Sequence, residues 1–111
     1  MSDSYWRAVV LMWIALPATW LNYNRPWARL PERVAVHFDA SWRPNAWSSR
    51  EAVLNHALAM TGGLLVVFTS AAILTRIRKP GSAWPMLVIC YFALFVAWFA
   101  DNTIVSHNLP R

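Results

Sequence analysis

The sequence has little of what a soluble or secreted domain needs. Only 14% of its 111 residues are charged and 58% are hydrophobic, whereas soluble domains average about 25% and about 45–50%. A soluble fold of this size buries only about two-thirds of the surface that its unfolded chain exposes, so it could not hide this much apolar surface. The single cysteine, Cys90, excludes a disulfide-stabilised scaffold. The sequence therefore predicts a protein embedded in the lipid bilayer. The eight Trp residues agree with this, because tryptophan is enriched at membrane–water interfaces.

Three apolar stretches predict an all-α integral membrane protein with three transmembrane helices. Each stretch approaches the ~20 apolar residues that a span requires. We interpret residues 1–111 as a single membrane domain, in which a linker separates the first two helices and a tail follows the third. The expected helices cover about 6–22, 52–75 and 84–101, the linker covers 23–51 and the tail covers 102–111.

The first stretch is the least regular of the three. Arg7 must reach the head groups, and Pro17 predicts a kink. A secretory signal peptide is the competing interpretation, but no small-residue cleavage pattern follows the stretch, so a retained helix is favoured.

Three spans would place the linker and the tail on one side of an inner membrane that the chain crosses several times. The basic turn at Arg76, Arg78 and Lys79 favours the cytoplasm, which puts the linker outside. The linker itself carries five arginines, so charge alone leaves the orientation open.

The linker contains the most specific pattern of the chain. Val34, Val36 and Phe38 alternate with more polar neighbours, which predicts a short half-buried strand. Residues 41–45 are typical of a turn, and Ser48 or Ser49 can cap the next helix. We therefore expect an ordered strand and turn that rest on the bilayer surface.

This pattern resembles a bacterial membrane family, domain of unknown function 1648, in which it lies between the first two helices. Where the family usually has glycine in the turn, this chain has Trp42, which carries a steric cost at positive φ. A related segment begins the immunity proteins that protect bacteria from the sporulation-delaying toxin. The matching residues are Leu30, Pro31, Val34, His37, Phe38, Asp39, Pro44, Asn45, Trp47, Ser49 and Arg50.

The resemblance implies a non-catalytic protein of the immunity or sensing type, whose linker binds a peptide, toxin or other protein outside the cytoplasm. A small accessory subunit of a larger membrane complex is the alternative, and a second copy of the chain is a further candidate partner. The residues expected to contact a ligand are His37, Phe38, Asp39, Pro44, Asn45 and Trp47.

Catalytic and cofactor chemistry are not predicted. The sequence contains no nucleophile–base pair, glycine-rich phosphate loop or paired-carboxylate spacing, so an enzyme is disfavoured. Nucleic acid is a poor partner because the basic residues are divided between two membrane faces. His37, His56 and His107 would share the linker face with acids, but their spacing matches no metal motif. We therefore predict no metal site and no cofactor.

Small residues form a stripe on each of the last two predicted helices: Ala59, Gly63 and Ser70 on the second, and Ala93 and Ala97 on the third. Such stripes let helices approach closely, either within this chain or against another one. His56 and Asp101 continue these stripes at similar depth. A charge-assisted hydrogen bond between them is therefore predicted.

Overall fold

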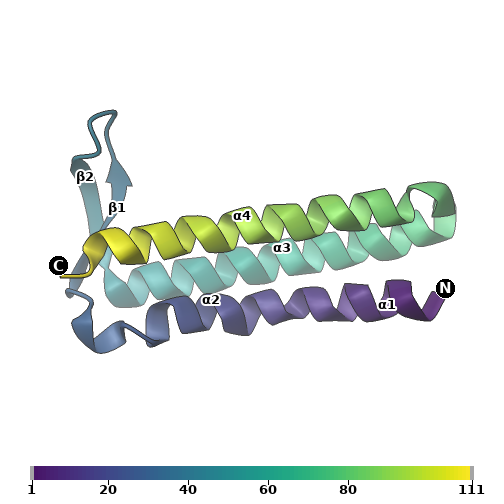
Figure 1. The fold of residues 1–111 in the computed structure, drawn as a ribbon, viewed down its shortest axis with the longest axis horizontal. Helices are drawn as coiled ribbons and strands as arrows, with labels where there is room; N and C mark the ends of the chain where they lie inside the picture. The colour runs from purple at the N-terminus through teal and green to yellow at the C-terminus, as the bar shows by residue number, and fades with distance from the viewer. Residues whose placement is uncertain (1, 111) are drawn as a thin grey trace.

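A computed structural model describes residues 2–110 and shows three long helical runs side by side, with a β-hairpin at one end (Figure 1). The elongated molecule measures 47 × 29 × 21 Å. The elements are, in order, α1 (Ser2–Leu11), η1 (Met12–Ile14), α2 (Ala15–Asn24), η2 (Trp27–Arg29), β1 (Arg33–Phe38), β2 (Pro44–Ser49), α3 (Arg50–Arg78), η3 (Pro80–Ser82) and α4 (Ala83–Asn108).

Two of the helical segments are long and apolar enough to cross a membrane. They are Arg50–Arg78 and Pro80–Asn108, each of 29 residues, which corresponds to about 43 Å against the ~30 Å of a hydrocarbon core. The first helical run lies alongside both of them (Figure 1). It does not form one long helix, because η1 divides it into two helices of 10 residues.

The interruption at η1 has a local cause. Pro17 lacks an N–H, and its ring meets the carbonyl of Trp13, four residues earlier. Trp13 is the middle residue of η1, so the chain takes the tighter 3-10 geometry where the proline disturbs the α-helix. The irregularity expected near Pro17 is therefore found one turn before it.

The interior of the bundle consists of two apolar clusters. The cluster near the α3–α4 turn includes Tyr5, Met12, Leu65, Leu87 and Cys90. The cluster near the hairpin contains Tyr23, Leu30, Val34, Val53, Ala57 and Val105. Thr19 and Thr61, whose buried hydroxyl oxygens lie 3.4 Å apart, come between the two clusters along α2 and α3. The hairpin is thus joined to the bundle by its own part of the core.

The buried face of α3 differs from the expected one. Its buried residues are Val53, Ala57, Thr61, Leu65 and Ala72, whereas Ala59, Gly63 and Ser70 are exposed. The buried residues from Val53 to Leu65 recur every four positions and therefore lie on one side of the helix. Burying Val53 and Leu65 removes more apolar surface from contact with solvent than burying the small residues of the stripe would. Packing of the small-residue stripe within this chain is therefore not observed.

The third long helix follows its prediction more closely, except at its end. Ala93 and Ala97 of α4 are partly buried, beside the buried Cys90 and Leu94. The helix continues through the expected tail to Asn108. Val105 explains this extension. Its side chain is buried in the core at the hairpin end, which it reaches only if the helix continues by another turn.

Candidate functional site

The linker forms an antiparallel hairpin. Ala35 of β1 pairs with Trp47 of β2, and Phe38 pairs with Pro44, with irregular register between them. The first strand was predicted, but the second strand coincides with residues expected to form a turn and a helix start. In Figure 1 the hairpin extends sideways from the end of the bundle, across its long axis. Residues 41–47 are exposed, so this arm presents most of β2 to its surroundings.

Asp39 organises the turn of the hairpin. Its Oδ1 accepts hydrogen bonds from the backbone N–H groups of Ser41 and Arg43, at 2.8 and 3.0 Å. Trp42 has a φ of 62°, in the left-handed region where glycine is favoured. Trp42 therefore occupies the kind of turn position at which a tryptophan carries a steric cost. Its indole stacks on the ring of His107, with centroids 5.9 Å apart, which offsets part of that cost.

Asn108 fastens the hairpin to the end of α4. Its Oδ1 accepts from the N–H of Ala35 at 2.8 Å, and its Nδ2 donates to the carbonyl of Ala35 at 2.9 Å. The side chain therefore pairs with β1 much as a neighbouring strand would. Phe38 adds a ring contact with His107, at 5.2 Å between centroids.

Replacing Asn108 by alanine should loosen this attachment. The N–H of Ala35 loses its acceptor, which costs about 1–1.5 kcal/mol and corresponds to roughly tenfold faster amide exchange. Hydrogen exchange of the protein in lipid measures this rate. The matched control is Asn55→Ala, an exposed amide on α3. Unchanged exchange at Ala35 would show that Asn108 does not hold the strand.

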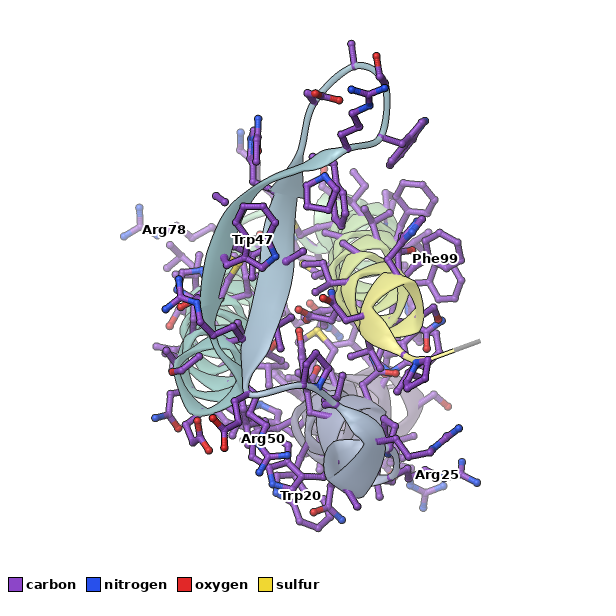
Figure 2. All side chains as sticks on the ribbon, turned by 90° about the vertical axis from the view of Figure 1, so that its left-hand side faces the viewer. Trp20, Arg25, Trp47, Arg50, Arg78 and Phe99 are labelled. Atoms are coloured by element: carbon purple, nitrogen blue, oxygen red, sulfur yellow. The ribbon has the colours of Figure 1, made fainter. Side chains whose placement is uncertain are left out.

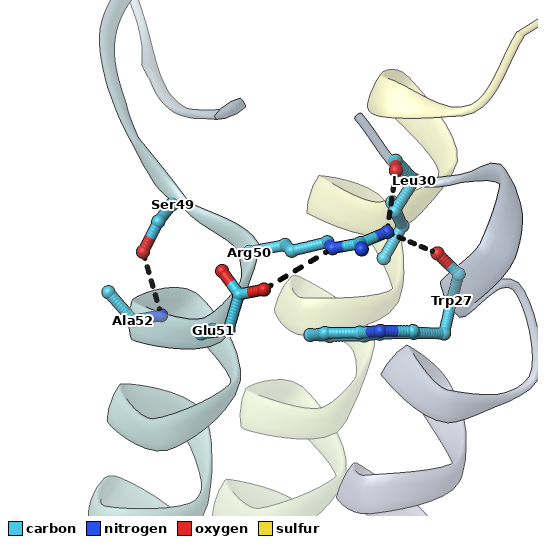
Figure 3. Close-up of polar contacts among 6 residues, drawn as sticks. All are labelled: Trp27, Leu30, Ser49, Arg50, Glu51 and Ala52. Atoms are coloured by element: carbon cyan, nitrogen blue, oxygen red, sulfur yellow. Dashed lines mark hydrogen bonds and ion pairs between the residues drawn. The ribbon is translucent and has the colours of Figure 1, made fainter. Parts of the chain in front are cut away.

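Arg50 joins the start of α3 to the turn that precedes the hairpin (Figure 3). Its Nη1 donates to the carbonyls of Trp27 and Leu30, at 3.0 and 3.2 Å. Its guanidinium also lies 4.7 Å above the indole of Trp27, which is a cation–π contact. Ser49 precedes it as the N-cap and accepts the N–H of Ala52 at 3.1 Å. The serine cap agrees with the sequence prediction.

A groove of about 600 Å³ lies between the helices beneath the hairpin. Alanines on the facing sides of α3 and α4 leave the space open, because their side chains are short. The hairpin contributes Val36 and Ser48 to its wall. The full lining comprises Tyr23, Val36, Ser48, Ala52, Val53, His56, Ala57, Met60, Thr61, Ala97, Ala100, Asp101 and Ile104.

Asp101 is the only acid in the lining of this groove. The hydroxyl of Tyr23 donates to its Oδ1 at 2.7 Å. His56 lines the same groove, but within residues 2–110 it forms no hydrogen bond or ion pair with Asp101. His56 and Asp101 therefore lie in the same region, as their positions in the sequence predict, but the predicted hydrogen bond between them is absent and Tyr23 is the partner of Asp101 instead. The available signal was that a buried tyrosine needs a partner for its hydroxyl.

The residues that were predicted to contact a ligand differ in exposure and in their contacts. His37 Nδ1 and Asn45 Oδ1 lie 2.7 Å apart across the strands, on the exposed surface. Trp47 is 49% exposed, and Pro44 is also exposed. Phe38 and Asp39 instead help to hold the hairpin together. Within residues 2–110, no three residues of the histidine, cysteine or acidic types lie close enough to hold a metal ion.

These features define a class of protein, namely a small helical protein with two helices apolar enough to cross a membrane and a lateral hairpin. The profile of one family, Domain of unknown function (DUF1648), matches residues 8–60. The match covers just under half of the chain and confirms the resemblance found in the linker. The matched segment runs from α1 through the hairpin into α3, whereas α4 lies outside it. No curated protein and no solved structure matches the chain.

Proposed function

We propose that this is a non-catalytic membrane protein that binds a peptide or protein ligand at its hairpin end. The observation that supports the proposal is the groove beneath the hairpin, which combines an apolar lining with Asp101 and His56. Binding sites are typically concave and largely apolar, with a few polar groups that orient the ligand. A carboxylate in such a groove favours a ligand segment with a basic side chain.

The hairpin extends the proposed site beyond the groove. Trp47 and the His37–Asn45 pair offer aromatic and polar contact surface. The sheet has only two strands in the described part of the chain, and the outer edge of β2 could therefore accept an extended peptide. A ligand that inserts one residue into the groove and lies along the hairpin would use both features.

The proposed setting is the inner membrane, with the bundle crossing it three times. The first helical run would then cross together with α3 and α4, and the hairpin would lie along the outer surface. The sideways direction of the hairpin supports this arrangement, because an arm across the bundle axis runs parallel to a membrane that the bundle crosses (Figure 1). Ligand binding at this surface is what the immunity or sensing hypothesis requires.

An accessory subunit of a larger membrane complex is the second candidate. It is favoured by the exposed stripe of Ala59, Gly63 and Ser70 on α3. Small residues of this kind let a helix from another chain, or from a second copy of this one, approach closely. In that case the stripe, rather than the groove, would be the main contact.

Site-specific photocrosslinking in the host membrane tests the proposal. A benzoylphenylalanine replaces Trp47 on the hairpin, Met60 in the groove, or Val88 as a control, which is exposed on α4 near the other end. We expect Trp47 and Met60 to capture the same peptide or protein, and Asp101→Asn to reduce both products. Capture from Val88 at equal yield would contradict ligand binding at the hairpin end. Native mass analysis after gentle detergent extraction tests the second candidate. Other proteins bound to this chain in a fixed ratio would favour the role of an accessory subunit instead.

A further inference from the structure

A second groove lies on another side of the bundle, between α2 and α4. Its volume is about 720 Å³, and no aspartate or glutamate of the described residues lines it. Arg25 and Arg29 line it near the hairpin end. Figure 2, which looks along the bundle, shows Arg25 and Arg50 on opposite flanks of α2. The lining comprises Ala18, Leu21, Asn22, Arg25, Pro26, Arg29, Trp98, Asn102, Val105, Ser106 and Leu109.

The polarity of this groove changes along the bundle. Arg25 and Arg29 lie at the outer end, with Asn102 and Ser106 of α4 nearby in the lining. Ala18 and Trp98 lie deeper, with Ala18 about 10 Å below Arg25 by helical rise. The groove therefore has a cationic outer end and an apolar inner end, as a phospholipid site requires.

A smaller cavity of about 210 Å³ adjoins the groove on the side toward the middle of the bundle. The two share Ala18 and Trp98 in their linings. The continuation is lined otherwise by Met12, Ile14, Ala15, Tyr91, Leu94 and Phe95. Tyr91 lies about 10 Å beyond Trp98 by helical rise. The combined groove thus spans about 20 Å, more than one half of a ~30 Å hydrocarbon core.

Hydrogen bonds within the chain fix the wall where the two parts meet. Trp98 Nε1 donates to the carbonyl of Ala18 at 3.2 Å, and Asn22 Nδ2 donates to the carbonyl of Trp98 at 3.1 Å. These donors are therefore already used. Arg25 and Arg29 form no ion pair within residues 2–110, so their guanidinium groups can bind a ligand.

We propose that this groove and the adjoining cavity bind a phospholipid with an anionic head group, independently of the ligand site beneath the hairpin. Arg25 and Arg29 bind the phosphate, because guanidinium groups pair with phosphate oxygens through two parallel hydrogen bonds. Asn102 and Ser106 lie beside the glycerol region. One acyl chain follows the apolar continuation past Phe95. The same pairing of basic side chains with lipid phosphates occurs in basic pockets between membrane helices on the cytoplasmic side.

Native mass spectrometry of the full chain in detergent tests the proposal. Phosphatidylglycerol and phosphatidylcholine with identical acyl chains are titrated separately. Loss of charge-assisted hydrogen bonds to phosphate should weaken phosphatidylglycerol binding by the R25Q/R29Q variant about tenfold or more. Binding of phosphatidylcholine should change less, because its choline cation already offsets the phosphate charge that the two arginines neutralise in phosphatidylglycerol. Both substitutions are on exposed side chains, so the fold should be preserved.

Three comparisons make the result specific. The R33Q/R43Q variant removes the same charge from the exposed hairpin and should retain phosphatidylglycerol binding. The Ala18→Leu variant narrows the groove and should weaken binding of both lipids. Millimolar inorganic phosphate should displace neither lipid. Equal weakening in the two arginine variants, unchanged binding in R25Q/R29Q, or displacement by phosphate alone would overturn the proposal.

Discussion

Replacing Arg50 by alanine is expected to lower the free energy of unfolding by about 3 kcal/mol, because two carbonyls lose a charge-assisted donor. These carbonyls belong to Trp27 and Leu30 (Figure 3). The same change removes the cation–π contact with Trp27. The turn before the hairpin would then separate from the start of α3. Reversible unfolding in a detergent–lipid mixture, followed by circular dichroism, measures the loss.

Two further variants give this prediction its controls. Arg50→Lys keeps the charge but replaces the planar guanidinium, so it should recover only part of the stability. Arg33→Ala removes an exposed arginine from the nearby strand and should change the free energy of unfolding by less than about 0.5 kcal/mol. An equal loss for Arg50→Ala and Arg33→Ala would mean that Arg50 does not join the turn to the helix.

Replacing Tyr23 by phenylalanine is expected to cost about 2 kcal/mol, because it leaves a partly buried acceptor without its donor. That acceptor is Oδ1 of Asp101, which the tyrosine hydroxyl reaches at 2.7 Å. The ring itself stays, so the apolar packing at the hairpin end is preserved. Tyr91→Phe is the comparison variant. Its hydroxyl also donates a hydrogen bond, but to the uncharged carbonyl of Ala8 on the exposed side of the bundle, so its loss should cost less.

Double-mutant cycles separate the partners of Asp101. The cycle of Tyr23→Phe with Asp101→Ala should deviate from additivity by about 1 kcal/mol or more, because the two side chains are in contact. The cycle of His56→Ala with Asp101→Ala tests the pair predicted from the sequence. Strict additivity in the second cycle would mean that histidine and aspartate share the groove without interacting. Strict additivity in the first cycle would contradict the observed hydrogen bond.

The sequence predicts the positions of the long helices well, because the hydropathy and length of a stretch indicate where such a helix lies. The same stretches appear in α3 and α4, although both helices extend past their predicted ends. The buried face of α3 was not predicted, since a stripe of small residues and a face of larger residues both have helical spacing. Only the three-dimensional arrangement of the helices decides which face is buried.

The hairpin shows a different limit of sequence analysis. Alternation predicted β1, but β2 contains proline, asparagine and serine, which have low strand propensity. Its pairing with β1 depends on the turn that joins the two strands, and the contact that attaches β1 to α4 joins Ala35 to Asn108, 73 residues apart in the chain. The steric cost of tryptophan at positive φ follows from its side chain alone, whereas the stacking of Trp42 on His107 depends on the position of α4.

The residues that carry the family resemblance have mainly structural roles in this chain. Leu30 and Val34 are buried, Asp39 bonds the turn, and Arg50 holds the preceding carbonyls. His37, Asn45 and Trp47 remain at the surface. The motif therefore specifies a folded hairpin first, and the proposed ligand contacts are the surface residues that this hairpin positions.

Cysteine labelling tests most directly whether the hairpin faces the outside, on which the proposed function depends. Ser41 is on the hairpin and Ser82 is in η3 at the opposite end of the bundle (Figure 1). Each is replaced by cysteine in a Cys90→Ala background and treated in intact cells with an impermeant thiol reagent. We expect Ser41→Cys to react at once and Ser82→Cys to react only after the membrane is permeabilised. Labelling of Ser82→Cys alone in intact cells would contradict the proposed orientation, and labelling of both would contradict a membrane span by α3, the helix that separates the two positions.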